Sequence, residues 1–230
     1  MTTVYIISAP SGSGKSTLVE KVRHIVPRLE FSISYTTRPP RGAEVNGREY
    51  FFVSRDEFRE MIERHEFLEH AEVFGNYYGT ARRFLQEAEA KGNDLLLDID
   101  VQGAEQIKRT LPQAVSIFIL PPDRKTLEVR LRHRSLDAEE VIQRRLFTAS
   151  REIENYAKYD YILINDRLEE STDALKAILL AERLKCLGVS QSTDDSNTLI
   201  QAERCLLANV QGRIQPILAS FVAAAAPGGR

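Results

Sequence analysis

Residues Ala9–Thr17 (APSGSGKST) constrain the fold of this chain more than any other segment. They follow the apolar run Val4–Ile7, which is typical of a buried strand, and they precede a stretch with apolar residues at helical spacing. A glycine-rich loop between a strand and a helix directs its backbone N–H groups at phosphate oxygens, and the helix N-terminus adds a favourable dipole. The segment therefore predicts a phosphate-binding loop in an α/β fold.

Individual residues of this loop have predictable tasks. Gly12 and Gly14 permit backbone conformations that are closed to residues with a Cβ. We expect Lys15 to bridge the β- and γ-phosphates of a nucleotide, and the Ser16 hydroxyl to help hold Mg²⁺. Ala9 stands where a glycine usually opens the loop, and its methyl group fits there if its φ is negative. An inert Ser/Gly connector is the alternative, and the strand–loop–helix setting disfavours it.

Apolar runs that alternate with helical patterns extend the prediction to a parallel sheet. Strands are expected at the runs that begin at Leu95, Val115 and Tyr161, and a half-buried strand is expected over Phe31–Tyr35. Strands that alternate with helices favour an α/β fold whose parallel sheet carries helices on both faces.

A segment rich in turns interrupts this alternation between about residues 34 and 80 and predicts an inserted mixed α/β lobe. The Asn46-Gly47 pair predicts a hairpin turn leading into Tyr50–Val53. A capping box over Ser54–Glu57 predicts the start of a helix. Gly75–Gly79 is expected to be another turn-rich stretch.

Composition narrows the classes of function. The 230 residues carry 31 Lys and Arg against 33 Asp and Glu, and the net charge of −2 argues against a general nucleic-acid or membrane-surface binder. Two cysteines, Cys186 and Cys205, exclude a disulfide scaffold and suit a reducing compartment. No secretion signal or membrane span is predicted, so we expect a cytoplasmic protein. Gly188–Asn197 is expected to be a linker to a C-terminal extension of unknown role.

Two arginines flank a pair of prolines in the segment Arg38-Pro39-Pro40-Arg41. Polyproline geometry has about three residues per turn, so Arg38 and Arg41 are able to face one ligand, and guanidinium groups suit bidentate contact with phosphate. Tyr50 and Tyr78 each lie beside a turn and can donate to the same phosphate. On this segment alone, a solvated basic loop with core tyrosines explains the pattern equally well.

Glu69 is an acidic residue in an otherwise apolar run. Guanine presents N1–H and N2–H₂ donors side by side, which one carboxylate can accept, whereas adenine presents an acceptor at N1. The hydroxyls of Ser34 and Thr80 are candidates for further contacts to the base. An ordinary surface glutamate is the alternative for Glu69 taken alone.

An arginine-rich helical region is predicted next. Its arginines are Arg130, Arg132, Arg134, Arg144 and Arg145. Helical spacing places Arg130 and Arg134 on one face, which repels itself unless it meets an anion. Nearby glutamates (Glu128, Glu139 and Glu140) offer the alternative of a solvated face.

Together these segments resemble guanylate kinase, the ATP:GMP phosphotransferase. Besides the loop with Ser8, the resemblance is carried by Ser34–Arg41 (SYTTRPPR), Glu44–Tyr50 (EVNGREY), Glu69, Gly75–Thr80 (GNYYGT), Leu97–Gly103 (LDIDVQG) and Ile164–Asp166 (IND). It covers about residues 3–185. The Thr-Thr-Arg and Gly-Asn-Tyr-Tyr-Gly blocks are specific, and the chain has no Asn-Lys-x-Asp motif of the kind a GTPase carries.

The resemblance implies phosphoryl transfer from ATP to GMP, giving ADP and GDP for guanine nucleotide supply, with Mg²⁺ as cofactor and dGMP as a further acceptor. It implies a P-loop core (1–33, 81–121 and 146–187), a GMP-binding lobe (34–80) and a helical lid (about 122–145).

The implied site residues form three sets. For ATP binding they are Ala9, Pro10, Ser11, Gly12, Ser13, Gly14, Lys15, Ser16, Thr17 and Asn165. For GMP binding they are Ser34, Arg38, Arg41, Tyr50, Glu69, Tyr78, Thr80, Asp98 and Asp100. The catalytic residues are Lys15, Arg130, Arg134 and Arg145, and Ser16 holds Mg²⁺ with Asp98 and Asp100 acting through water.

Two departures from the family pattern and three rival functions stay open. His133-Arg134-Ser135 stands where the family often has Gly-Arg-Gly, which would stiffen the lid, and nothing after Lys185 matches a family motif. A kinase for a phosphorylated sugar would not need a base reader such as Glu69. A non-catalytic interaction module of the same family would lack a working phosphate loop, and the net charge disfavours an RNA-binding protein. We expect no nucleic-acid or membrane partner, and the oligomeric state is undecided.

Overall fold

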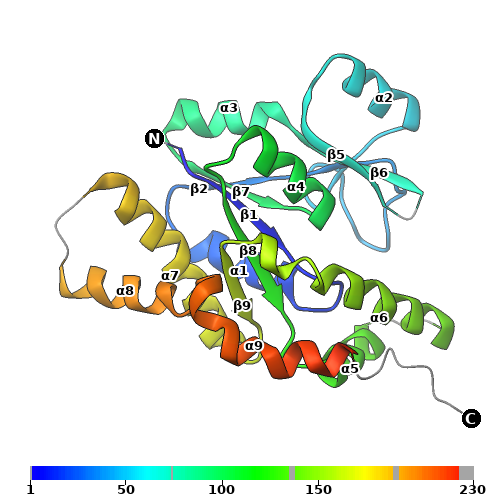
Figure 1. The fold of residues 1–230 in the computed structure, drawn as a ribbon. Helices are drawn as coiled ribbons and strands as arrows, with labels where there is room; N and C mark the ends of the chain where they lie inside the picture. The colour runs from blue at the N-terminus through cyan, green and yellow to red at the C-terminus, as the bar shows by residue number, and fades with distance from the viewer. Residues whose placement is uncertain (1, 74, 135–137, 189–191, 223–230) are drawn as a thin grey trace, which may run out of the picture. The chain divides into compact units, whose positions relative to one another are not determined.

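Two β-sheets organise the chain in the structure, a computed structural model that describes residues 2–73, 75–134, 138–188 and 192–222 (Figure 1). Five strands form one sheet in the order β2-β7-β1-β8-β9, and four form a second sheet in the order β4-β3-β6-β5. The β2–β7 and β8–β9 pairs are parallel, as expected for an α/β fold.

The elements have the following bounds. The strands are β1 Val4–Ser8, β2 Leu29–Ser32, β3 Tyr35–Thr36, β4 Phe51–Phe52, β5 Phe67–Val73, β6 Asn76–Ala81, β7 Asp94–Asp98, β8 Val115–Leu120 and β9 Tyr161–Ile164. The α-helices are α1 Lys15–Ile25, α2 Arg55–Glu63, α3 Arg82–Lys91, α4 Val101–Thr110, α5 Arg124–Arg134, α6 Glu139–Ile153, α7 Leu168–Leu187, α8 Thr193–Glu203 and α9 Leu207–Val222, and a short 3₁₀ helix spans Tyr156–Lys158.

The chain divides into two compact units. The first comprises Met1–Ile6 and Val26–Val115, and the second comprises Ile7–Ile25 and Ser116–Arg230. The four-stranded sheet belongs to the first unit together with α2, α3 and α4. The second unit contains α1 and every described helix from α5 onward.

In the first unit, β6 pairs antiparallel with both β3 and β5, and β4 adds to β3 in parallel. Phe58 and Met61 of α2 pack with Phe67 of β5 into a small apolar core. Helix α2 begins where the sequence predicts, because the Ser54 hydroxyl accepts a hydrogen bond of 3.1 Å from the N–H of Glu57.

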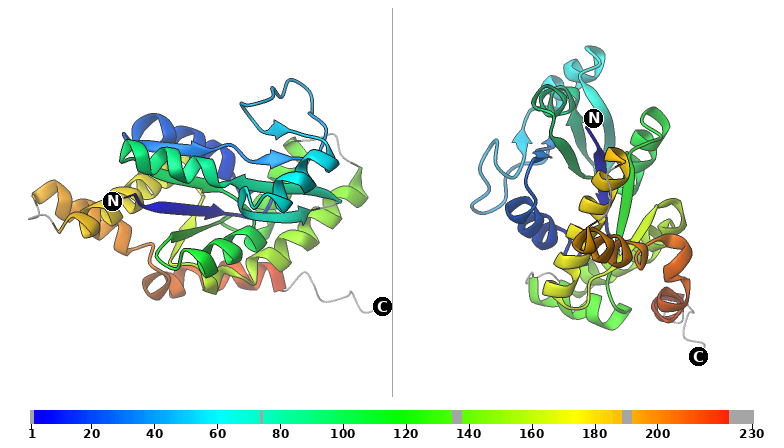
Figure 2. Two further views of the ribbon diagram at one scale, coloured as in Figure 1. Left: turned by 90° about the horizontal axis from the view of Figure 1, so that it is seen from above. Right: turned by 90° about the vertical axis from the view of Figure 1, so that its left-hand side faces the viewer.

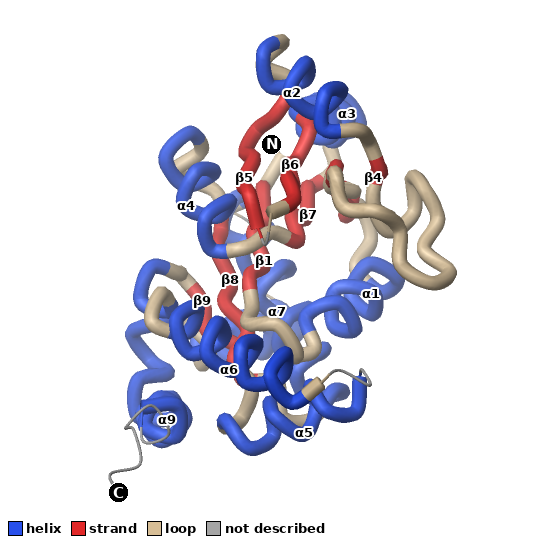
Figure 3. The backbone as a smooth tube through the Cα atoms, turned by 90° about the vertical axis from the view of Figure 1, so that its right-hand side faces the viewer, coloured by secondary structure: helices blue, strands red, loops and turns tan. Residues whose placement is uncertain are grey.

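In the second unit, helix α7 packs against α1 and β9. Helix α8 lies beside α7 (Figure 2), and α9 contacts α5, α6 and β9 (Figure 3). Among the described residues, no helix combines the length and apolar character that crossing a membrane requires.

Two strand predictions in the first unit are wrong in detail. The stretch Phe31–Tyr35 is not one strand, since β2 ends at Ser32 and Tyr35 begins β3 in the other sheet. Alternating apolar residues fit either sheet equally, so the pattern alone does not locate the break. Asn46-Gly47 is a turn with Gly47 at φ 82°, but it makes no hairpin, because the following strand β4 pairs in parallel with β3.

The Gly75–Gly79 stretch is also more ordered than expected. Gly75 turns with φ 76°, and β6 begins immediately afterwards at Asn76, which pairs with Val73 of β5. Most of the segment Gly75–Gly79 therefore belongs to a strand that pairs with β5.

The expected linker over Gly188–Asn197 is wrong from Ser192 onward. Ser192 and Asp195 form a reciprocal capping box that starts helix α8 at Thr193. After α8, the chain runs back along the edge strand β9, where the Ile162 N–H donates to the Cys205 carbonyl at 2.7 Å. The C-terminal extension is thus folded onto the second unit.

Candidate active site

The predicted phosphate loop lies in the second unit, between β1, which ends at Ser8, and α1, which begins at Lys15. Gly12 and Gly14 have φ angles of 89° and 87°, the left-handed region that favours glycine. Ala9 is not among the described non-glycine residues with positive φ, so the condition for its methyl group is met. The loop leads directly into the N-terminus of a helix, the arrangement that binds phosphate.

A side chain from the end of β9 packs against this loop. Asn165 donates from its amide to the carbonyl oxygen of Ser13 at 2.7 Å. A Cβ added to Gly14 would lie 2.3 Å from the same amide nitrogen, so close packing also requires glycine there. The hydroxyl of Ser13 is buried and has no hydrogen-bond partner within the described chain.

Arg130 of α5 reaches the same region of the second unit. Its Nη2 donates to the carbonyl oxygen of Asn165 at 3.0 Å, while its Nη1 is buried without a partner among the described residues. A buried guanidinium nitrogen without an acceptor is costly unless an anion binds to it. The environment of Arg130 therefore suits contact with a phosphoryl group.

Arg132 belongs to the solvated face that the sequence left as an alternative. It makes ion pairs with Glu128 at 2.7 Å and Glu139 at 2.6 Å. The hydrogen bond from Arg132 is the main reason that the pKa of Glu139 is lowered to about 2. Arg144 is also exposed.

The two remaining predicted arginines lie within the range of the expected lid, about residues 122–145. Arg145 is half-buried on α6. Arg134 is the last residue of α5, and its side chain lies outside the described residues, as does Ser135. Their roles stay predictions.

The predicted phosphate clamp lies in the first unit. Arg38 is buried, and its guanidinium pairs with Glu44 at 3.0 Å and donates to the Pro39 carbonyl at 2.7 Å. The other carboxylate contact of Glu44 is with the backbone N–H of Arg41, at 2.8 Å. Glu44 thus holds the basic loop together, and its position three residues after Arg41 was the only sequence signal for this contact.

Two tyrosines stand beside Arg38. The Arg38 guanidinium carbon lies 5.3 Å from the centre of the Tyr50 ring, and the Tyr50 and Tyr78 rings meet edge to face at 5.9 Å. Burial is the main cause that raises the pKa of Tyr50 to about 12, and the charge of Asp98 adds to it. Tyr50 therefore keeps its proton and can donate a hydrogen bond.

Glu69 is buried, with 5% of its surface exposed, and is not the surface glutamate of the alternative interpretation. It accepts a hydrogen bond of 2.6 Å from the hydroxyl of Thr80. Burial raises the pKa of Glu69 to about 7; the bond from Thr80 opposes this, and the nearby charge of Asp100 reinforces it. Helix α4 contributes Gly103, where an added Cβ would lie 2.6 Å from a Glu69 carboxylate oxygen.

An irregularity in strand β5 aims the Glu69 side chain. Phe67 pairs with Ala81, but Glu69 pairs with Thr80, so Leu68 is an extra residue in the ladder. In a regular strand, Phe67 and Glu69 are two residues apart and would share one face of the sheet. The bulge instead sends Phe67 into the apolar core and Glu69 to the face of α4.

Three other residues predicted to bind GMP lie at or beside the ends of strands and helices in the first unit. Asp98 ends β7, and Asp100 caps helix α4 by accepting a bond of 2.8 Å from the N–H of Gly103. Ser34 lies half-buried between β2 and β3, where its carbonyl accepts from the N–H of Phe51. A ligand role for these three residues stays a prediction.

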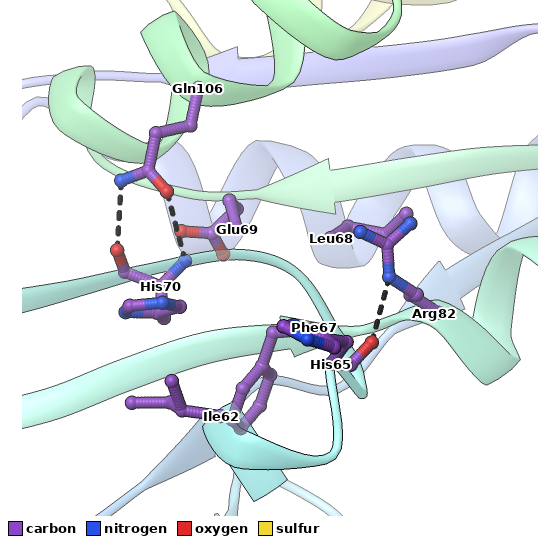
Figure 4. A pocket seen from close by; sticks show the side chains of 8 residues that line it. All are labelled: Ile62, His65, Phe67, Leu68, Glu69, His70, Arg82 and Gln106. Atoms are coloured by element: carbon purple, nitrogen blue, oxygen red, sulfur yellow. Dashed lines mark hydrogen bonds between the residues drawn. The ribbon is translucent and has the colours of Figure 1, made fainter. Parts of the chain in front are cut away.

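A shallow pocket of about 260 Å³ lies beside Glu69 in the first unit (Figure 4). It is lined by Ile62, His65, Phe67, Leu68, Glu69, His70, Arg82 and Gln106. The side-chain amide of Gln106 on α4 accepts from the N–H of His70 and donates to its carbonyl oxygen. The sequence does not predict this contact.

The structure therefore groups the predicted residues by unit. The loop Ala9–Thr17 with Arg130, Arg134, Arg145 and Asn165 falls in the second unit; Ser34, Arg38, Arg41, Tyr50, Glu69, Tyr78, Thr80, Asp98 and Asp100 fall in the first. We call the two sets the loop set and the lobe set.

Comparison with known proteins finds similarity to the family that the sequence motifs resemble. The sequence model of the family described as "Guanylate kinase" matches residues 1–182. A guanylate kinase of Koribacter versatilis (strain Ellin345) is 59% identical over 228 residues, which cover 98% of each chain. A guanylate kinase of Escherichia coli (strain K12) is 51% identical over 194 residues, covering 84% of this chain and 94% of the relative. The crystal structure of guanylate kinase from Anaplasma phagocytophilum is 37% identical, with a TM-score of 0.64 over 79% of this chain and 86% of that one.

Proposed function

Because this chain belongs to the guanylate kinase family, it transfers a phosphoryl group from ATP to GMP, and we propose that the loop set binds ATP and the lobe set binds GMP. The observation that carries this division is the buried Glu69 carboxylate. It is held by a hydroxyl and a helix, with no cationic partner among its described contacts, and so it is suited to accept from the two adjacent donors of guanine.

The loop set handles the donor nucleotide. Backbone N–H groups of Ser11–Gly14 surround the phosphates, and Lys15 neutralises charge at the β- and γ-phosphates. Asn165 keeps the loop in shape through Ser13. The Nη1 of Arg130, which has no partner among the described residues, donates to a phosphate oxygen of the bound nucleotide. Arg134 and Arg145 supply positive charge that stabilises the transferring phosphoryl group.

The lobe set handles the acceptor. Arg38, Arg41, Tyr50 and Tyr78 bind the GMP phosphate. Glu44 orients this clamp, because it bonds to both arginines of the basic loop. Glu69 accepts from N1–H and N2–H₂ of guanine, and Ser34 and Thr80 complete the contacts. Deoxyguanosine monophosphate presents the same base and phosphate, so it is a second acceptor.

The chemistry needs no covalent intermediate. A phosphate oxygen of GMP attacks the γ-phosphorus in line, the bond to the β-phosphate oxygen of ATP breaks, and ADP and GDP result. Lys15 and the arginines stabilise the charge that spreads over the transferring group. The role of the protein is to position the two nucleotides and exclude water.

Mg²⁺ is the proposed metal. Among the described residues, no group of three or more His, Cys, Asp or Glu side chains is arranged to hold a metal ion. This fits an ion that binds chiefly to nucleotide phosphates and keeps several waters, as Mg²⁺ does. The exposed hydroxyl of Ser16, in the first turn of α1, would hold it, with Asp98 and Asp100 acting through water. When bound, the ion neutralises negative charge on the β- and γ-phosphates.

We also place the enzyme in the cytoplasm, since its two cysteines form no disulfide in the described chain and a reducing compartment suits them.

A coupled assay for ADP release tests the proposal with GMP, dGMP, AMP, CMP, UMP and a ribose bisphosphate as acceptors. We expect GMP and dGMP to be turned over with kcat/KM at least about a hundredfold above the other acceptors. Comparable turnover of AMP, or preferential turnover of the sugar phosphate, would contradict the role given to Glu69.

A further inference from the structure

At the outer edge of strand β5, a side chain of helix α4 bonds to the backbone. Strand β5 is the last strand of its sheet, so its outer side has no neighbouring strand in that sheet. There, Gln106 donates from Nε2 to the carbonyl oxygen of His70 at 2.8 Å and accepts with Oε1 from the N–H of His70 at 3.3 Å (Figure 4). The amide thus satisfies both backbone groups, as the next strand would.

The same face of α4 carries the glycine that touches Glu69. Gly103 and Gln106 are three residues apart and therefore neighbours on the helix surface. Gly103 leaves the space that the Glu69 carboxylate occupies, since an added Cβ would lie 2.6 Å from its oxygen. Helix α4 therefore contacts two consecutive residues of β5: it makes room for the side chain of Glu69 and bonds the backbone of His70.

Strand β5 needs such support at this point. The bulge at Leu68 interrupts the ladder to β6 immediately before Glu69, so regular pairing alone does not fix the direction of the carboxylate. Two guanine donors require both carboxylate oxygens in the correct plane, and a small rotation of the strand would favour one donor over the other.

We propose that Gln106 is a positioning residue for base selection: by pinning the backbone of His70, it holds Glu69 so that both oxygens meet the N1–H and N2–H₂ donors of guanine. The proposal rests on the proposed role of Glu69 as base reader. In this role Gln106 acts through the backbone of His70 and not by contact with a nucleotide. It affects the selectivity between purine bases because it orients the Glu69 carboxylate.

The test compares GMP with inosine monophosphate, which keeps N1–H and the phosphate but lacks the 2-amino group. In Gln106→Leu, both bonds to His70 are lost. We expect KM for GMP to rise about tenfold, the preference for GMP over inosine monophosphate to fall by a similar factor, and kcat and KM for ATP to stay within about twofold. Gln86→Leu is the matched control, because Gln86 is an exposed glutamine on α3 of the same unit.

A second variant perturbs the same carboxylate without removing the Gln106 bonds. Gly103→Ala favours the helix by intrinsic propensity, yet its methyl group displaces the Glu69 oxygen. We expect the same loss of preference for GMP over inosine monophosphate. If both variants lower the melting temperature and kcat but leave this preference at the wild-type value, Gln106 is only a structural residue and the proposal is overturned.

A third variant, Glu69→Gln, distinguishes an error in the positioning role of Gln106 from an error in the proposed function of Glu69. If Glu69→Gln changes the preference and Gln106→Leu does not, only the positioning role is wrong. If Glu69→Gln leaves the preference unchanged, Glu69 is not the base reader and the proposed function of that residue fails first. In the double variant, Gln106→Leu should have no further effect on the preference, because its action passes through Glu69. An additional, independent effect would overturn the proposal.

Discussion

The side-chain amide of Asn165 donates to the carbonyl oxygen of Ser13 at 2.7 Å, and this bond joins the end of strand β9 to the phosphate loop. The two residues are 152 positions apart in the chain. The same amide nitrogen leaves no space for a side chain on Gly14, and the Asn165 carbonyl accepts from Arg130. One asparagine therefore links the loop to an arginine proposed to contact the transferring phosphoryl group.

This link predicts the effect of Asn165→Ala. The substitution removes the bond to Ser13, and we expect KM for ATP to rise about three- to tenfold, the worth of one buried hydrogen bond, with KM for GMP nearly unchanged. Steady-state kinetics with each substrate varied in turn measures this. Asn197→Ala, an exposed asparagine on α8, is the control. An unchanged KM for ATP would show that the loop keeps its shape without Asn165.

Lys15→Met tests the loop set. We expect a folded protein whose kcat falls at least about 10²–10³-fold, because one preorganised charge donor at the transferring group is lost. A matched measurement of the melting temperature establishes that the variant is folded. Wild-type turnover in this variant would mean that Lys15 does not contact the phosphates.

The parts of the fold that sequence predicts are those governed by local chemistry. The strand–loop–helix at Ala9–Thr17 is visible because only glycine tolerates the conformations at Gly12 and Gly14. The cap at Ser54 is visible because a hydroxyl ahead of a helix has one obvious partner, the Glu57 N–H.

The parts that sequence does not predict depend on partners far away in the chain. An extra residue at Leu68 leaves no mark in the sequence, yet it decides which face of β5 carries Glu69. In the sequence, Gln106 is an ordinary helix residue, and its bonds to His70 of β5 are visible only in the structure. The Asn165 amide shows the same limit: its motif implies a nucleotide contact, whereas its bond to Ser13 is visible only in three dimensions.

The C-terminal extension is predicted to stabilise the second unit. Helix α9 buries Val210, Ile214, Ile217 and Phe221, and the Leu207 N–H donates to the Asp160 carbonyl beside β9. Each buried side chain contributes about 1.5 kcal/mol or more, so truncation after Gly188 should lower the melting temperature by roughly 10 °C or more. A shorter truncation after Val222 is the control and should leave it nearly unchanged. Equal melting temperatures for the long truncation and the full chain would contradict the packing of α9.

Glu69→Gln addresses the identity of the acceptor. The amide oxygen still accepts one guanine donor, but its NH₂ group turns a donor toward the other, and sites built on hydrogen bonds penalise such mismatches heavily. We expect kcat/KM for GMP to fall at least about a hundredfold. Some turnover should remain at high GMP because Arg38 and Tyr50 are untouched, and AMP should lose less than GMP. Equal losses for both nucleotides would make Glu69 a residue of the lobe's fold.

The protonation of Glu69 predicts a pH dependence with a definite sign. Burial raises the pKa of this carboxyl from 4.5 to about 7, so below pH 7 much of the free enzyme carries a neutral Glu69 that cannot accept from both guanine donors. We therefore expect kcat/KM for GMP to rise as the pH increases through about 7. Stability changes in the opposite direction: between about pH 4.5 and 7 the unfolded carboxyl ionises while the folded one keeps its proton, so this group lowers the free energy of unfolding as the pH rises across that window.

Glu69→Gln is the control for both effects, because the second ionisation of the GMP phosphate, near pH 6, is common to wild type and variant. The ratio of wild-type to variant kcat/KM, measured from pH 5.5 to 8.5, removes that shared ionisation and should increase with pH before levelling off above about 8. In thermal unfolding over the same range, the stability of wild type relative to the variant should fall as the pH rises to about 7. A ratio that stays flat across this range would mean that Glu69 is already ionised in the free enzyme, held so by contacts stronger than the bond from Thr80.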